Sequence, residues 1–175
     1  MSENPFIIGD IESVTPHISR LVGMMGYARR MTLDAVDGLT VAQLDHLQDP
    51  ASNTIGSLLL HIAAVESWYQ ANTFDGREWT PAERARWGIA MDLGDRARQA
   101  IRGYPLAYYM GELETVRART LQELRHRDDT WLAITGPFFD REVNNYFKWF
   151  HVFEDEINHR GQIRWLRKRL QGDDR

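Results

Sequence analysis

The pattern that decides the fold lies near the C-terminus, in the stretch His151-Val-Phe-Glu-Asp155-Glu-Ile-Asn-His159-Arg-Gly-Gln162. On an α-helix, His151, Asp155 and His159 recur every four residues, so successive members rotate by only about 40° and rise by about 6 Å. The flanking pattern places them on the inward face of the helix, which they share with Phe147, Asn158, Gln162, Trp165 and Leu166. Two imidazoles and a carboxylate inside a core are costly unless a partner satisfies them, and a divalent metal ion is the commonest such partner. The stretch therefore predicts a long core helix that carries metal ligands.

The composition indicates a single globular domain that spans residues 1–175. A chain of 175 residues with 43% hydrophobic and 26% charged residues can bury a sizeable core. The net charge of -4 argues against nucleic-acid binding, because a nucleic-acid interface needs an excess of basic residues. The sequence contains no cysteine, which excludes disulfides, cysteine-ligated zinc and a cysteine nucleophile.

The sequence shows no targeting or membrane signal. Its first residues lack a basic region followed by an apolar run, so we expect no signal peptide. No stretch approaches about 18 consecutive apolar residues, so we expect no membrane span. The cytoplasm is therefore the expected location.

Four segments show the periodicity of long amphipathic helices, and no segment alternates for long enough to predict a strand. The helices are expected at about residues 15–36, 54–73, 105–127 and 143–170. The connection from Phe74 to Tyr104 is long enough to cross the whole bundle, and Thr80-Pro81-Ala-Glu83 within it is typical of a capping box that opens a short helix. Such a crossover lets the second and third helices run parallel. The sequence predicts an all-α four-helix bundle with a long crossover between helices two and three.

A metal site in a bundle needs ligands from facing helices. His61 is the histidine in the middle of the second predicted helix, where it shares a face with Leu58, Ala64, Val65 and Trp68. A lone histidine on such a face is often a hydrogen-bonded core residue, but the second inward cluster on helix four favours a shared metal ion. His151 and His159 are about 12 Å apart along the helix, too far for both to hold one ion. Helix four therefore contributes either His151 with Asp155 or Asp155 with His159.

Two motifs resemble those of the DinB/YfiT-like family of four-helix-bundle metalloenzymes. The string Asp155-Glu-Ile-Asn-His159-Arg-Gly-Gln162-Ile163 is similar to the closing motif of that family, in which His-x-x-x-His on helix four precedes Arg-Gly-Gln. The string Ser57-Leu-Leu-Leu-His61-Ile-Ala-Ala-Val-Glu66-Ser-Trp68-Tyr69 is similar to its helix-two motif with a single histidine. The resemblance covers most of the chain, because four helices with a long middle crossover are also the plan of the family.

The resemblance implies a divalent metal site with three protein ligands, His61, Asp155 and His159, in a bundle that often forms a homodimer. Zinc or nickel is the metal it favours, with iron or manganese as alternatives. The family usually has a histidine where this chain has Asp155, so the chain departs from the pattern at one ligand. Two imidazoles and one carboxylate leave coordination positions open, as in catalytic zinc sites and non-haem iron triads.

Three further polar residues are expected beside the ligands. His151, Asn158 and Gln162 would either orient ligands and substrate or only complete the hydrogen bonding of the core. His151 lies one helical turn outside the predicted site. Glu156 is expected to be solvated, and Arg160 is expected at the surface or in a dimer contact.

The function that the resemblance implies is that of a metal-dependent transferase, because the family includes thiol-dependent S-transferases and a mycothiol-dependent isomerase. Its substrates would be small molecules, among them a low-molecular-weight thiol, since a chain without cysteine cannot supply the thiolate itself. Two alternatives stay open. One is a metal-dependent hydrolase that uses bound water. The other is a non-catalytic dimeric bundle in which the His/Asp cluster is a structural polar layer or a degenerate metal site.

Overall fold

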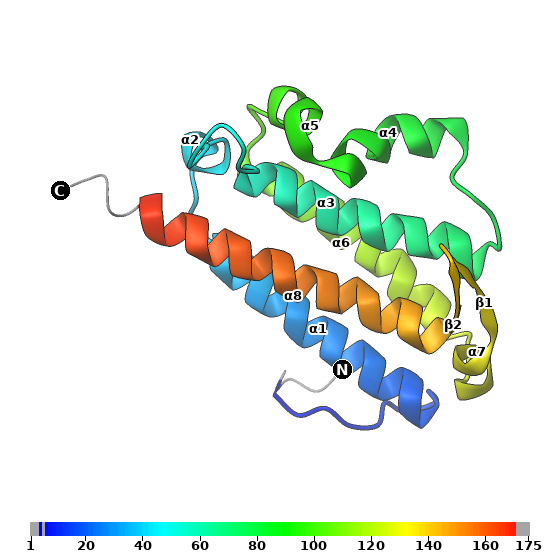
Figure 1. Ribbon diagram of the computed structural model, residues 1–175. Coiled ribbons are helices and arrows are strands. Elements are labelled where there is room, and N and C mark those ends of the chain that lie inside the picture. Colours follow the sequence, from blue (N-terminus) through cyan, green and yellow to red (C-terminus); the bar gives the residue numbers. More distant parts are fainter. Residues whose placement is uncertain (1–3, 5, 171–175) are drawn as a thin grey trace.

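The computed structural model describes residue 4 and residues 6–170, and four long helices dominate it (Figure 1). These are α1 (Pro16–Val36), α3 (Ile55–Tyr69), α6 (Leu106–Leu124) and α8 (Asn145–Leu170). The predicted all-α bundle is confirmed. None of the described helices is long and apolar enough to cross a membrane.

The contacts between the long helices show in which direction each one runs. Glu66 of α3 and Gln70, the residue that follows α3, contact Arg117 and Thr120 of α6 in the same order, so these two helices run parallel. Contacts between α3 and α8 run in the opposite order, which makes that pair antiparallel. The structure therefore has the parallel arrangement of helices two and three that the long crossover allows.

The crossover itself is mostly helical and packs against α3. A short π-helix, η1 (Gln70–Phe74), extends α3, and α4 (Pro81–Asp92) and α5 (Gly94–Ala100) follow it. The predicted capping box opens α4: the Thr80 hydroxyl accepts from the Glu83 amide, and the Glu83 carboxylate accepts from the Thr80 amide. Trp87 of α4 is buried in the core, so the crossover forms part of the fold rather than a loose linker.

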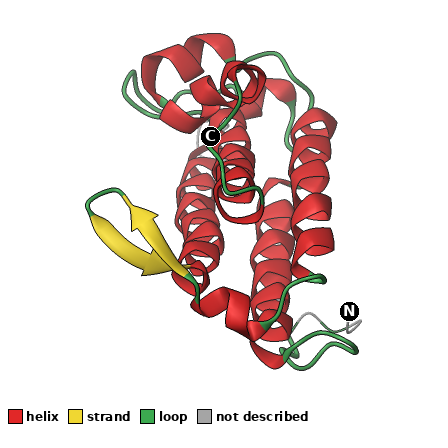
Figure 2. Cartoon of the chain, turned by 90° about the vertical axis from the view of Figure 1, so that its right-hand side faces the viewer, coloured by secondary structure: helices red, strands yellow, loops and turns green. Residues whose placement is uncertain are grey.

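Two short helices and a hairpin complete the chain. The helices are α2 (Val41–Leu44) and α7 (Asp129–Ala133), and the hairpin pairs β1 (Thr135–Phe138) with β2 (Arg141–Asn144). The hairpin projects from one end of the bundle (Figure 2). The sequence pattern predicts no strand, and these two strands were missed. Strands of four residues are too short to show alternation, and Pro137 interrupts the pattern. The hairpin turn places Phe139 at a φ of 54°, which leaves its side chain exposed.

A layer of buried charge divides the core. Two apolar clusters lie on either side of it, one around Leu59 and Ile163 and the other around Met25 and Trp149. The layer consists of one residue from each long helix, Arg29, Glu66, Arg117 and Glu156, and we call it the charge layer. Both carboxylates in the layer are fully buried.

Each arginine of the charge layer bonds both glutamates. The Arg29 Nε donates to Glu156 at 2.9 Å and its Nη2 to Glu66 at 3.1 Å. Arg117 donates to Glu66 at 2.7 Å and to Glu156 at 3.1 Å. The expectation that Glu156 is solvated was therefore wrong. The pattern of α8 alone could not reveal two cations supplied by α1 and α6.

The inward face of α8 is also rotated from the expected one. Its buried residues are Asn145, Lys148, Trp149, Val152, Phe153, Glu156, Ile163 and Leu166. Of the residues expected to face inward, Leu166 is buried, but Phe147, Asn158, Gln162 and Trp165 are exposed. The stripe of His151, Asp155 and His159 is partly buried and lies along the border of the core. Arg160 is half-buried rather than free at the surface, with a guanidinium nitrogen 3.5 Å from the Ala28 carbonyl oxygen.

Candidate metal centre

His61 projects from the middle of α3 toward α8, and a residue of the crossover fixes its orientation. The imidazole Nδ1 lies 3.0 Å from the carbonyl oxygen of Ala90 in α4. A carbonyl can only accept, so this contact assigns the ring proton to Nδ1 and leaves the lone pair on Nε2. A hydrogen bond of this kind is the usual support of a metal-binding imidazole. The hydrogen bond from the crossover therefore leaves His61 Nε2 facing α8.

Asp155 and His159, one turn apart on α8, face that nitrogen. Asp155 Oδ2 is 3.9 Å from His61 Nε2, and Asp155 Oδ1 is 3.4 Å from His159 Nε2. The two imidazole rings meet edge to face, with centroids 4.7 Å apart. The side chains of His61, Asp155 and His159 are only 11%, 18% and 13% exposed. The structure thus brings together the three residues that the resemblance implies as ligands.

The donor set fits a divalent ion. One ligand atom from each of the three residues lies within 4.8 Å of the others. Ligands about 2.0–2.2 Å from a tetrahedral ion are roughly 3.4 Å apart, so only a small contraction would close the set. Asp155 Oδ2 and His159 Nδ1 are buried and have no hydrogen-bond partner among the described residues. Asp155 Oδ2 also faces His61 Nε2, and a cation bound between them would satisfy this oxygen.

The protonation of the two imidazoles differs. Burial lowers the pKa of His61 below its ordinary value, although the charge of Asp155 acts in the opposite direction. Burial also opposes the charged form of His159, but the hydrogen bond and charge of Asp155 outweigh it and raise the pKa of His159. The lowered pKa of His61 favours the neutral imidazole that a metal ion needs, whereas the raised pKa of His159 makes protons stronger competitors of a metal ion at that residue.

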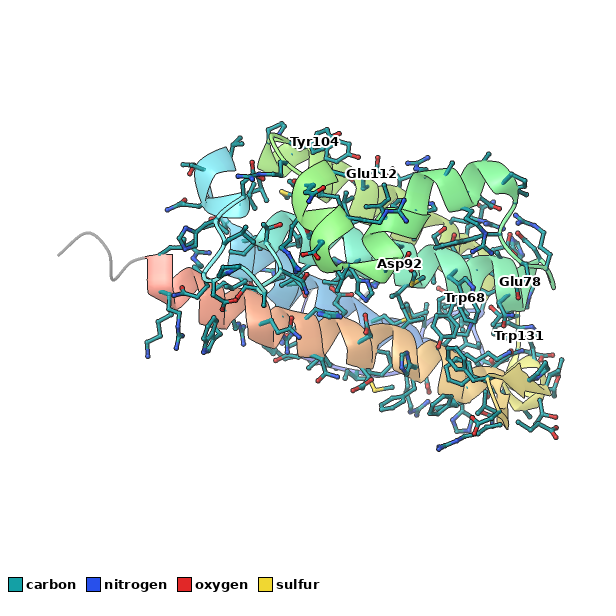
Figure 3. All side chains as sticks on the ribbon, turned by 45° about the horizontal axis from the view of Figure 1, so that its top comes forward. Trp68, Glu78, Asp92, Tyr104, Glu112 and Trp131 are labelled. Carbon is teal, nitrogen blue, oxygen red and sulfur yellow. The ribbon has the colours of Figure 1, made fainter. Side chains whose placement is uncertain are left out.

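Aromatic side chains flank the cluster on the hairpin side. His151 lies one turn before Asp155, with its Nδ1 3.4 Å from the Tyr69 hydroxyl. The Tyr69 ring stacks on Phe138 of the hairpin at a centroid distance of 6.3 Å. Burial and the charge of Asp155 raise the pKa of Tyr69, so its hydroxyl stays protonated and can donate a hydrogen bond. Figure 3 shows Trp68, the residue before Tyr69, between α3 and α8.

Asn158 and Gln162 lie on the other side of the cluster. Both are exposed and line a groove of about 510 Å³ with Asn53 and Trp165. The Asn158 amide donates to Glu154 on the preceding turn. These two residues therefore lie at the surface beside the candidate ligands, and a side-chain hydrogen bond from Gln162 helps to raise the pKa of His159.

The sequence analysis missed two kinds of residue that shape the site. Tyr69 lies eight positions after His61, two turns along the same side of α3, and this spacing could have indicated it. The other kind is the charge layer, two members of which are close to the candidate ligands in sequence: Glu156 follows Asp155 directly, and Glu66 lies five residues after His61. No signal in a single helix could have indicated that layer.

The chain matches the model of a known protein family. The family model described as Mycothiol-S-transferase matches residues 20–172, a range that contains the three candidate ligands and all four long helices except the first residues of α1. No curated protein matches the chain. The match confirms the DinB/YfiT-like resemblance, because the matched family is of that type. The chain belongs to the mycothiol-S-transferase family.

Proposed function

We propose that the protein is a metal-dependent S-transferase that joins a low-molecular-weight thiol, mycothiol by the family match, to an electrophilic small molecule. The observation that carries the proposal is the convergence of His61 of α3 with Asp155 and His159 of α8. These three residues would hold the ion, with zinc or nickel as the favoured metals and iron or manganese as the alternatives. A divalent ion held by them would lower the pKa of a bound thiol.

The chain supplies the groups that the reaction needs around the ion. A carbon–sulfur bond forms between the thiol sulfur and the electrophilic carbon, the leaving group departs with its electron pair, and the thiol proton must be taken up. His151 is suited to accept that proton, since its imidazole lies one turn from Asp155 and outside the ligand set. The Tyr69 hydroxyl can hydrogen-bond the leaving group, and the contacts of the Tyr69 ring with Trp68 and Phe138 help to position it.

The experiment that tests this function measures thioether formation. Purified protein, prepared without a histidine tag and loaded with one divalent metal at a time, is mixed with mycothiol and a fluorogenic alkylating reagent. We expect metal-dependent formation of the thioether, detected by mass spectrometry, and loss of at least about 100-fold in rate in His61→Ala, a loss typical of removing a catalytic group. Cysteine in place of mycothiol is the control for thiol selectivity.

The same assay separates the alternatives. Consumption of an ester or amide substrate without any thiol, dependent on the same three residues, would replace the transferase with a hydrolase. Stoichiometric metal binding with neither activity would support a non-catalytic bundle with a degenerate site.

Variants of Asp155 and His151 distinguish the proposed ligand set from one that uses His151. We expect Asp155→Ala to lose at least about 10-fold in metal affinity and His151→Ala to change it little, because the His151 imidazole contacts Tyr69 rather than the cluster. Asp155→His should keep the metal and shift its preference toward zinc, nickel or copper, since imidazole is a softer ligand than carboxylate. Equilibrium metal titrations of the three variants provide the measurement. A damaging His151→Ala with a silent Asp155→Ala would move the site one turn along α8.

The homodimer and the cytoplasmic location remain predictions. Light scattering on the purified protein would determine the oligomeric state, and cell fractionation would determine the location.

A further inference from the structure

Lys148 occupies an unusual position at the hairpin end of the seam between α3 and α8. The residue is only 5% exposed, and its Nζ donates to Asn72 Oδ1 at 2.9 Å. Asn72 belongs to η1, which continues α3. Three pairs therefore succeed one another along the seam: Lys148 with Asn72, His151 with Tyr69, and Asp155 with His61.

The Lys148 ammonium lacks the partner that a buried cation needs. Within the described part of the chain it forms no ion pair, and its hydrogen bond is to a neutral amide. Burial lowers the pKa of Lys148, and no neighbouring charge opposes that effect. The residue also lies in the first turn of α8, where the helix dipole disfavours a cation and no acidic residue compensates. A charge so placed destabilises the fold unless an anion joins it.

The ammonium borders a groove of about 480 Å³ between η1, the hairpin and the start of α8. Neutral polar groups of Asn72, Thr73 and Asn145 line it, and Trp131 supplies an apolar wall. The backbone of β1 approaches closely at Gly136, where a Cβ would be 3.8 Å from Lys148 Nζ. Figure 3 shows Glu78 and Trp131, which both line the groove, at the end of the bundle that carries the hairpin.

The charges at the rim of the groove are of two kinds. Arg77 is neutralised by Asp75 at 2.9 Å and by Glu83 at 2.6 Å. Glu78 is exposed and forms no ion pair within the described residues. The groove therefore offers one uncompensated buried positive charge, that of Lys148.

We propose that this groove is a carboxylate-binding subsite in which the Lys148 ammonium pairs with the carboxylate of a small molecule. A single buried ammonium matches a monoanion, whereas a phosphate dianion would need a second free cation, which the groove lacks. The amides of Asn72 and Asn145 can complete the hydrogen bonding of a carboxylate. Trp131 and Pro137 suit an apolar body attached to it.

The position of the subsite suggests its use. Lys148 precedes Asp155 by seven residues, two helical turns, so the two side chains leave α8 in nearly the same direction about 10 Å apart. A substrate of that length could place its reacting atom at the candidate metal centre and its carboxylate at Lys148. This anchoring role rests on the proposed function, whereas carboxylate binding itself does not.

The sequence contains only two lysines, Lys148 and the exposed Lys168, which makes a direct test available. Protein labelled with ¹³C at lysine Cε is titrated with benzoate at constant ionic strength, with benzamide and inorganic phosphate as comparison probes. An anion stabilises the ammonium, so saturating benzoate should raise the measured pKa of Lys148 by about one pH unit or more and leave Lys168 unchanged. Benzamide should have no effect, and the response should persist in His61→Ala.

Each other outcome overturns the carboxylate subsite. No response of Lys148 to benzoate, a response to phosphate alone, or a response that disappears in His61→Ala would each do so. Because the wild-type protein gives this readout, the test does not depend on a Lys148 variant that folds.

The anchoring role has its own measurement in the S-transferase assay. For an alkylating substrate with a carboxylate, Lys148→Met should raise KM at least about 10-fold, and for its methyl ester KM should stay unchanged. Equal effects on the acid and the ester would remove the anchoring role. A protein with no transferase activity would remove the proposed function and the anchoring role, while the lysine titration would still decide the subsite.

Discussion

Replacing His61 with alanine is expected to abolish tight metal binding and the stabilisation that comes with it. Loss of a supporting residue alone costs metal sites about 10–100-fold in affinity, so loss of one of three proposed ligands should cost at least about 100-fold. A metal ion present at about 100 times its Kd stabilises the folded state by about 2.7 kcal/mol. For a chain of this length that corresponds to a rise in Tm of roughly 5–10 °C.

The measurement compares melting curves with bound metal and after chelation. We expect chelation to lower the Tm of the wild-type protein by that amount and to leave His61→Ala unchanged. His126→Ala is the matched control, because His126 is exposed beyond the end of α6 and should keep the full chelator effect. An unchanged wild-type Tm after verified removal of bound metal would show that metal binding at the cluster does not stabilise the fold.

Replacing Glu156 with glutamine is expected to destabilise the protein strongly. The substitution removes one of two carboxylates from the charge layer and leaves Arg29 and Arg117 sharing only Glu66. Removing one partner of a buried ion pair typically costs about 3–5 kcal/mol, because the remaining charge stays buried without compensation. Urea unfolding of metal-free protein provides the measurement. Glu123→Gln, which breaks the partly exposed pair with Arg127, should cost less than about 1 kcal/mol.

The charge layer should also make the fold sensitive to acid. Burial by itself would raise the pKa of Glu66, but Arg117 and Arg29 outweigh burial and hold it below the ordinary value of 4.5. A carboxyl group whose pKa is lower in the folded state stabilises the fold above its unfolded pKa, and that contribution is lost as the pH falls through the folded pKa. The free energy of unfolding of metal-free protein should therefore decrease as the pH falls below about 4.5.

The two glutamine variants test the charge layer directly. If Glu156→Gln lowers the free energy of unfolding no more than Glu123→Gln does, the layer is not the buried network described above.

The helices were predictable because each one carries a local signal. Apolar periodicity and capping residues placed the four long helices, and the Thr80–Glu83 capping box placed α4. The hairpin was missed because its two strands have four residues each, too few for an alternating pattern. The length of the crossover showed that α3 and α6 could run parallel, since a connection of that size can span the bundle, but it did not decide their direction.

The candidate site also has a part that the sequence predicts and a part that it does not. His61, Asp155 and His159 could be selected from two short motifs, and the i, i+4 spacing of Asp155 and His159 guarantees that they share one side of α8. The sequence by itself thus determined the four-helix plan and the identity of the three clustered residues.

Only the tertiary structure decided which groups surround these three residues. A helical wheel fixes which residues share a side, but not how far the helix is rotated toward the core, so Asn158 and Gln162 proved exposed and Glu156 proved buried. The carbonyl of Ala90, the charge layer and the pairing of Lys148 with Asn72 each join elements far apart in the sequence. Such contacts depend on the relative placement of whole helices. That placement is set by the sum of their packing interactions, so the sequence of a single helix does not reveal it.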